Sequence, residues 1–181
     1  MIGDSCRTQS GALLREAKRV GLTTSFDVNV RLRLGDIDAW RRRVEEVLEH
    51  LDWFILGHEE AESLFVTEDP RQVEEDIRKL GFKGEGVVLK RGAMGVETSC
   101  SGQVIRVPAR PVHPVVDPVG AGDGFNAGWI AGMASGWPLE EALRLGTVMG
   151  AFAVASPGDS DGYPYLQEAI AELEGMDGHA R

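Results

Sequence analysis

The residues best suited to chemistry lie in a short glycine-rich stretch, G-A-G-D at residues 120–123, between an apolar segment and a helical pattern. Small residues at the start of a helix let backbone N–H groups converge on an anion, and the helix dipole adds partial positive charge there. A carboxylate inside such a turn is electrostatically costly, so Asp123 indicates a chemical task. The task that fits is to accept the proton of a hydroxyl group that attacks a phosphoryl group held by the turn.

Three competing interpretations of the glycine stretch fit the residues less well. A dinucleotide-binding turn needs a third glycine where Phe125 stands, and it belongs to the first strand–helix unit of a chain rather than to a late one. An oxidoreductase of that kind is a remote alternative. The G-x-x-x-x-G-K-[ST] pattern of P-loop proteins does not occur in the sequence. An ordinary tight turn without a ligand is the third interpretation.

Helical and strand-like patterns alternate around this stretch. Helical spacing of apolar residues covers 7–20, 37–51, 70–80, 125–134, 139–155 and 166–173, and strand-like segments cover 22–27, 53–56 and 86–90. Strands joined by helices of this length imply crossover connections, and hence a mostly parallel sheet with helices on its faces. The predicted fold class is therefore α/β, with an antiparallel hairpin formed by the β-rich segments on either side of Ser101-Gly102.

Composition excludes several classes of function. The chain has 19 basic and 29 acidic residues, a net charge of −10, and no basic stripe, which argues against binding to nucleic acid. It shows no targeting segment and no apolar stretch long enough to cross a membrane, so we expect a cytoplasmic protein. Cys6 and Cys100 match no metal or redox spacing. At 181 residues, a single domain over 1–181 is expected.

A longer stretch around the glycines resembles a known family. D-P-V-G-A-G-D at 117–123 is similar to the D-[TS]-x-G-A-G-D signature of PfkB carbohydrate kinases, with Pro118 in place of the usual Thr or Ser. The resemblance implies that Gly120, Ala121 and Gly122 cradle the phosphate transferred from ATP and that Asp123 is the catalytic base. It also implies a ribokinase-like three-layer fold. This chain would hold the C-terminal part, with the N-terminal part, the β-lid and the lid dimer interface absent.

Two further segments extend the resemblance. F-D-V-N-V-R at 26–31 is similar to the family's F-D-x-N-x-R, which implies nucleotide phosphate near Asn29 and an acidic sugar near Arg31. A guanidinium suits that role because it pairs bidentately with carboxylate or phosphate. K-R-G-A-M-G at 90–95 resembles K-x-G-x-x-G, which implies nucleotide contacts from Lys90, Gly92 and Gly95.

The remaining matches concern a metal and the sugar. G-H-E-E-A-E-S-L at 57–64 resembles N-x-x-E-A-E-x-L, in which Glu60 would help to organise Mg²⁺ through water, although Gly57 replaces the family's Asn. A carboxylate that only favours a helix N-terminus is the alternative for Glu60. G-D-S-D-G-Y-P at 158–164 resembles the ending of 2-keto-3-deoxygluconate kinases, in which Asp159 would contact the substrate.

These observations together predict ATP- and Mg²⁺-dependent phosphorylation of a hydroxyl on a sugar or sugar acid, with a 2-keto-3-deoxygluconate-like substrate favoured. The expected partner is this small molecule, with no nucleic acid and no membrane, and homo-oligomerisation is left open. The alternative is a truncated chain that binds nucleotide poorly and has no turnover.

Overall fold

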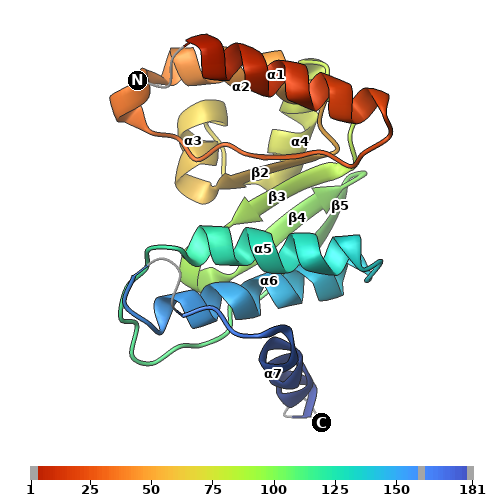
Figure 1. The fold of residues 1–181 in the computed structure, drawn as a ribbon. Coiled ribbons are helices and arrows are strands. Elements are labelled where there is room, and N and C mark those ends of the chain that lie inside the picture. Colours follow the sequence, from red (N-terminus) through yellow and green to blue (C-terminus); the bar gives the residue numbers. More distant parts are fainter. Residues whose placement is uncertain (1–3, 159–161, 179–181) are drawn as a thin grey trace. The chain divides into compact units, whose positions relative to one another are not determined.

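Helices and strands alternate along most of the chain, as the sequence predicts. A computed structural model describes residues 4–158 and 162–178 (Figure 1). They form two compact units: the first holds the chain up to Arg91 together with Glu97–Ile105, and the second holds Gly92–Val96 and the chain from Arg106 onward.

The element order is that of an α/β protein. Up to Lys90 the elements are α1 (Asp4–Arg19), β1 (Ser25–Asp27), the 3-10 helix η1 (Leu32–Leu34), α2 (Ile37–Leu48), β2 (Trp53–Gly57), α3 (His58–Phe65), α4 (Pro70–Lys79) and β3 (Gly86–Lys90). After it come the 3-10 helix η2 (Gly92–Met94), β4 (Val96–Cys100), β5 (Gln103–Val107), α5 (Ala121–Ala134), α6 (Leu139–Val154) and α7 (Leu166–Gly178).

The strands form one mixed sheet in the order β1-β2-β3-β4-β5. β1, β2 and β3 are parallel, with Phe26 opposite Phe54 and Phe54 opposite Val87. Between β4 and β5, Ser101 and Gly102 have φ angles of 51° and 76°. Positive φ at both central residues is the geometry of a type I′ hairpin turn, which makes β4 and β5 antiparallel. The predicted α/β class and the predominantly parallel start of the sheet are confirmed.

The first unit has its core between the sheet and the helices. Side chains of β2 and β3 alternate between the two faces of the sheet. Phe54 and Leu56 join the cluster formed with α2, α3 and α4, whereas Trp53, Ile55 and Val88 point to the opposite face and are also buried. Helix α2 begins where Asp36 accepts a hydrogen bond from the Ala39 amide at 2.8 Å, a typical N-cap.

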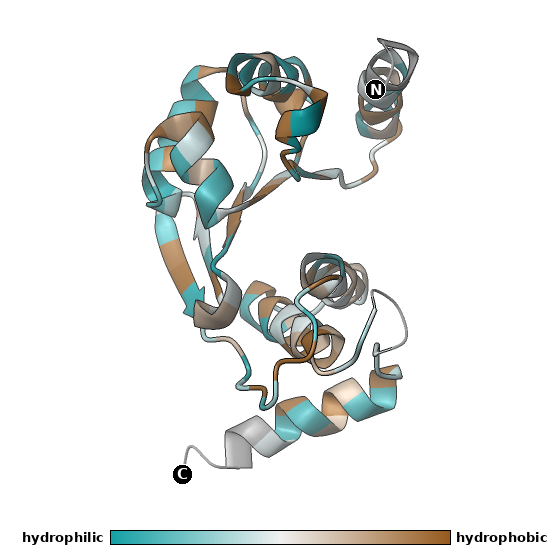
Figure 2. Cartoon of the chain, turned by 90° about the vertical axis from the view of Figure 1, so that its left-hand side faces the viewer, coloured by the Kyte–Doolittle hydropathy of each residue, from teal (hydrophilic) through white to brown (hydrophobic). Residues whose placement is uncertain are grey.

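In the second unit, α5 and α6 lie side by side in close contact (Figure 1). The contact depends on small residues: a Cβ atom on Gly132 would lie 2.8 Å from the Ala142 Cα, and one on Gly128 would lie 2.8 Å from the Leu145 carbonyl oxygen. Helix α7 packs on α6 through Ala169 and Leu173. Figure 2 shows α7 with both hydrophilic and hydrophobic stretches, as expected of a helix with one buried face.

Several predicted boundaries shift, and two of them are instructive. Helix α5 begins at Ala121, four residues before the predicted start at 125, because Gly120 already forms its N-cap. The predicted strand over 22–27 is shorter, since β1 covers Ser25–Asp27 only and Leu22 is exposed. Within the described residues, none of the helices combines the length and apolar character that a bilayer crossing requires.

Candidate active site

The glycine stretch forms a tight turn that leads directly into α5. The Ala121 amide donates a hydrogen bond to the Pro118 carbonyl oxygen at 3.4 Å, which closes a four-residue turn. Gly120, the third residue of this turn, has φ 82° and ψ −13°. These angles match the third position of a type II turn, which requires the left-handed region and so favours glycine. The first glycine of the motif is therefore explained by backbone geometry.

The first turn of α5 presents unpaired amide groups and one carboxylate. The first N–H groups of a helix have no intrahelical acceptor, and the amides of Gly122 and Asp123 form no hydrogen bond with the described residues. The Asp123 side chain is exposed and forms no hydrogen bond or ion pair with the described residues. The arrangement can bind an anion through backbone N–H groups and keeps a free carboxylate beside it.

Sequence reasoning missed two residues that support this turn. The Asp117 carboxylate accepts hydrogen bonds from the Val119 amide at 3.0 Å and from the Gly158 amide at 3.4 Å. The Tyr163 hydroxyl donates to the Gly120 carbonyl oxygen at 2.9 Å. Asp117 opens the predicted motif, so its presence there was a usable signal. Nothing in the sequence links Tyr163 to residue 120.

In the first unit, Lys90 is engaged by a carboxylate. Its Nζ atom lies 2.5 Å from Oδ2 of Asp27, and both side chains are largely buried. β1 and β3 flank β2 and are parallel, so Asp27 and Lys90 come together at the carboxyl edge of the sheet. The charge of Lys90 that was predicted to offset a phosphate is in this structure paired with Asp27. A role for Lys90 in nucleotide binding therefore stays a prediction.

Asn29 and Arg31 follow β1 at the same edge of the sheet, and both are exposed. Asn29 has φ 47°, a left-handed conformation that asparagine tolerates better than most residues. The Arg31 guanidinium contacts only the neighbouring Val30 carbonyl oxygen, at 3.5 Å, among the hydrogen bonds of the described residues. Both side chains are accessible to a ligand, and their predicted roles remain predictions.

The Glu60 carboxylate is held by two backbone amides. One carboxylate oxygen accepts from the Val30 amide at 2.5 Å and the other from the Gly57 amide at 2.7 Å. No group of three or more His, Cys, Asp or Glu side chains in the described ranges could hold a metal ion. These residues do not form a magnesium cage, so we derive no step through a protein-bound metal. The structure shows Glu60 joining two backbone segments, and its role in organising Mg²⁺ through water stays a prediction.

Three predicted site residues remain: Gly92, Gly95 and Asp159. Gly92 and Gly95 both have positive φ, at 55° and 100°, and bracket the 3-10 helix η2. A Cβ atom at Gly95 would lie 2.1 Å from the Val107 carbonyl oxygen, so a close backbone approach accounts for this glycine without a ligand. Asp159 lies outside the described residues.

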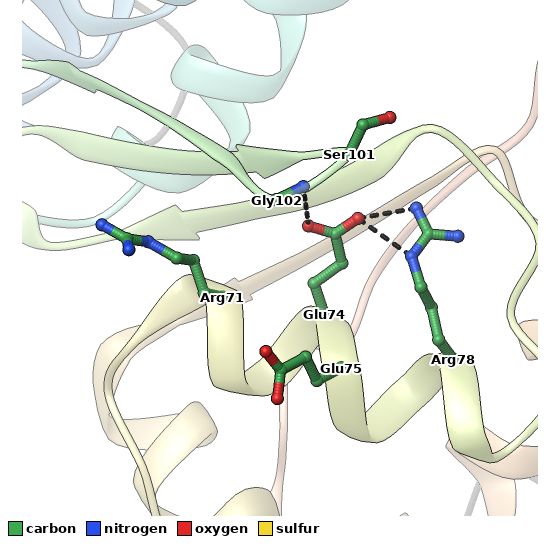
Figure 3. A pocket seen from close by; sticks show the side chains of 6 residues that line it. All are labelled: Arg71, Glu74, Glu75, Arg78, Ser101 and Gly102. Atoms are coloured by element: carbon green, nitrogen blue, oxygen red, sulfur yellow. Dashed lines mark hydrogen bonds and ion pairs between the residues drawn. The ribbon is translucent and has the colours of Figure 1, made fainter.

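A surface hollow in the first unit lies elsewhere, between α4 and the turn joining β4 to β5 (Figure 3). At its base the buried Glu74 accepts from Arg78 Nε at 3.0 Å, from the Ser99 hydroxyl at 2.5 Å and from the Gly102 amide at 3.3 Å. Burial alone would raise the pKa of Glu74, but these hydrogen bonds outweigh it and lower the pKa. None of the predicted site residues lines this hollow, and we interpret it as a structural link between α4 and the hairpin.

The family of the chain follows from its fold and its glycine turn. A ribokinase-type α/β unit with the G-A-G-D turn at the start of α5 is matched by the model of the pfkB family carbohydrate kinases over residues 2–165. The chain belongs to this family.

Named relatives agree with this assignment. The chain is 33% identical over 162 residues to a 2-dehydro-3-deoxygluconokinase of Bacillus subtilis, covering 89% of this chain and 49% of that protein. It is 34% identical over 176 residues to a fructokinase of Klebsiella pneumoniae, covering 92% and 56%. A solved structure of a putative ribokinase II from E. coli in complex with ATP and Mg²⁺ superimposes with a TM-score of 0.79 and 29% identity, covering 94% of this chain and 53% of that one. The chain thus spans about half the length of the relatives it matches.

Proposed function

We propose that this chain supplies the phosphoryl-transfer part of an ATP-dependent carbohydrate kinase, with Asp123 as the general base. The observation that carries the proposal is the first turn of α5, where an exposed, unpaired carboxylate lies beside amides that have no acceptor in the described structure. Membership of the pfkB family supports the same assignment.

The proposed chemistry follows from this turn. A sugar hydroxyl oxygen attacks the terminal phosphorus of ATP, the bond from that phosphorus to the ADP oxygen breaks, and the hydroxyl proton passes to the Asp123 carboxylate. The amides of the turn stabilise the charge on the phosphoryl oxygens through hydrogen bonds that are already oriented. Mg²⁺ would accompany ATP, bound through its phosphates rather than by these side chains.

For the substrate we propose a sugar acid of the 2-dehydro-3-deoxygluconate (2-keto-3-deoxygluconate) class. The proposal is supported by the similarity to the Bacillus subtilis enzyme and by the exposed guanidinium of Arg31, which suits a carboxylate. Fructokinase is a comparably similar relative, so a neutral ketose is the competing substrate class.

A second candidate is a chain that binds nucleotide weakly and has no turnover. It is favoured by one observation, namely that the chain spans about half the length of its relatives. Half of a kinase taken alone would supply only part of the positioning on which most of the rate depends.

The test is ADP release by the purified chain with ATP and Mg²⁺, measured against 2-dehydro-3-deoxygluconate, fructose, ribose and no sugar. The proposed function predicts sugar-dependent release, highest with the sugar acid. Highest release with fructose would support the proposed kinase activity and contradict the proposed sugar-acid substrate. No release with any sugar would favour the inactive chain, and sugar-independent release would contradict sugar phosphorylation.

A further inference from the structure

Tyr163 contacts the glycine turn from the segment that follows α6. Its side chain is half-buried, and its hydroxyl donates to the Gly120 carbonyl oxygen at 2.9 Å. The two residues are 43 positions apart in the chain and belong to the same compact unit. The predicted chemistry of the turn gives Tyr163 no task, so this contact requires its own explanation.

The Gly120 carbonyl is a central point of the turn. It accepts the first hydrogen bond at the start of α5, from the Gly124 amide at 2.8 Å, in addition to the Tyr163 hydroxyl. A carbonyl oxygen has two lone pairs, so both bonds can form together. The same peptide unit carries the Ala121 N–H group, whose bond to the Pro118 carbonyl oxygen closes the turn, so fixing the Gly120 carbonyl also fixes the turn from which the Gly122 and Asp123 amides follow.

The ring of Tyr163 adds a steric contact to the hydrogen bond. A Cβ atom at Gly124 would lie only 2.7 Å from the ring carbon Cε1, so the ring packs against the bare backbone of α5. The neighbouring backbone is held as well, since the Gly158 amide, which also follows α6, donates to the Asp117 carboxylate at 3.4 Å. The segment after α6 therefore supports the turn at more than one point.

We propose that Tyr163 is a positioning residue for phosphoryl transfer: its hydroxyl holds the Gly120 carbonyl so that the amides at the start of α5 and the Asp123 carboxylate keep their orientation. This inference rests on the proposed function of the turn. Tyr163 acts through the turn and contacts no reacting atom.

The test compares Tyr163→Phe with Tyr165→Phe, a matched control. Tyr165 is the other tyrosine of the chain, and its side chain is 84% exposed. Two quantities are measured in each protein: hydrogen exchange at the Gly124 amide, followed by NMR, and ATP affinity, measured by calorimetry. Hydrogen exchange reports on the turn without any ligand. It therefore tests whether the Tyr163 hydroxyl holds the turn, independently of whether the proposed function is correct.

We expect Tyr163→Phe to accelerate exchange at Gly124 and to weaken ATP binding about two- to twelvefold, the range expected for one net hydrogen bond. Tyr165→Phe should change neither. If the chain turns over sugar, Tyr163→Phe should lower kcat by a larger factor in the parent than in an Asp123→Asn background, because a purely structural loss would lower both alike.

Two outcomes would overturn the inference, and a third would contradict the proposed function on which it rests. Unchanged exchange at Gly124 in Tyr163→Phe would show that the hydroxyl does not hold the turn. Faster exchange with unchanged ATP affinity would show that the turn needs no such support to bind phosphate. A parent chain that binds no ATP would contradict the proposed function. Hydrogen exchange at Gly124 would then still show whether the Tyr163 hydroxyl holds the turn.

Discussion

At the scale of single residues, the contacts of Glu60 give this carboxylate a structural role. Each carboxylate oxygen accepts a hydrogen bond from a backbone amide. One amide belongs to Val30, beyond β1, and the other to Gly57, at the start of α3. A carboxylate in this position orders the segment that contains Asn29 and Arg31 and completes the N-terminal cap of its own helix. Its contribution to a site would therefore come from holding these exposed side chains in place.

We predict that Glu60→Ala lowers the free energy of unfolding by about 1–3 kcal/mol, because two partly buried amides lose their acceptor. The Val30 amide should also exchange faster with solvent. Glu59→Ala is the control, since Glu59 is exposed on the same helix turn and caps no amide by its side chain. Urea unfolding and NMR exchange measure both effects. An equal loss of unfolding free energy in the two variants would contradict the role of the Glu60 carboxylate as the acceptor of these amides.

Glu74 is the second carboxylate that determines local structure, and its effect depends on pH. The native hydrogen bonds lower its pKa. A lowered folded-state pKa means that the stabilisation is fully present above the ordinary value of about 4.3 and is lost as pH falls through the folded-state value. The pKa of Asp52 is also lowered: burial would raise it, but the interactions with Lys18 and Thr24 prevail, so Glu74 is one of several contributors to acid sensitivity.

We expect Glu74→Gln to lower the free energy of unfolding by about 1–3 kcal/mol near pH 7, since the amide is neutral and replaces one of the two oxygens that accept from Arg78 and from Ser99 and Gly102. The difference from the parent should shrink below about pH 4. Glu75→Gln, at an exposed position on the same helix, serves as the control. Denaturant midpoints across this pH range give the result, and a difference independent of pH would refute the assignment.

At the scale of elements, the contact between α5 and α6 should be sensitive to added volume. A methyl group on Gly132 would lie 2.8 Å from both Cα and Cβ of Ala142, and helix backbones yield little. We predict that Gly132→Ala destabilises the protein by about 1–3 kcal/mol.

Gly11→Ala is the matched control for this change. Gly11 lies within α1, and a Cβ atom there would have no neighbour within 4 Å. Replacing it should stabilise the chain by about 0.4–1 kcal/mol, because alanine loses less backbone entropy on folding. Thermal or urea unfolding of both variants measures the contrast. A neutral Gly132→Ala would mean that α5 and α6 can separate without cost.

The elements also show how much of the fold can be predicted from the sequence. Apolar periodicity predicts α2, α4, α6 and the parallel strands, because local burial patterns determine them. The 8-residue helix α3 follows β2 without a loop and was recognised only by its acidic start. The pair Lys90–Asp27 and the Glu60–Val30 bond join residues 63 and 30 positions apart. No local pattern encodes such contacts, since they depend on which strands align at one edge of the sheet.

At the scale of the whole molecule, β1 is an edge strand in the described structure, with β2 as its only neighbour. Unpaired strand edges and exposed apolar side chains favour association. Leu22, which precedes β1, is 60% exposed, and Leu13 of α1 is 71% exposed. We therefore predict concentration-dependent self-association of this chain.

Light scattering behind a sizing column tests this prediction. Leu22→Lys should reduce the associated fraction, because it introduces a charge beside the open edge of β1. Leu166→Lys is the control, since Leu166 is 57% exposed at the start of α7 in the other compact unit. A parent that stays monomeric at all concentrations would contradict the prediction.

The proposed kinase depends above all on the first turn of α5 carrying out phosphoryl transfer with Asp123 as the base. The rate of ATP-dependent sugar phosphorylation by Asp123→Asn tests this role, with Glu140→Gln, an exposed acid in the first turn of α6, as the control. We expect a 10²- to 10⁴-fold lower kcat for Asp123→Asn, with folding and ATP affinity little changed. A rate within about tenfold of the parent would contradict the assignment of Asp123 as the base.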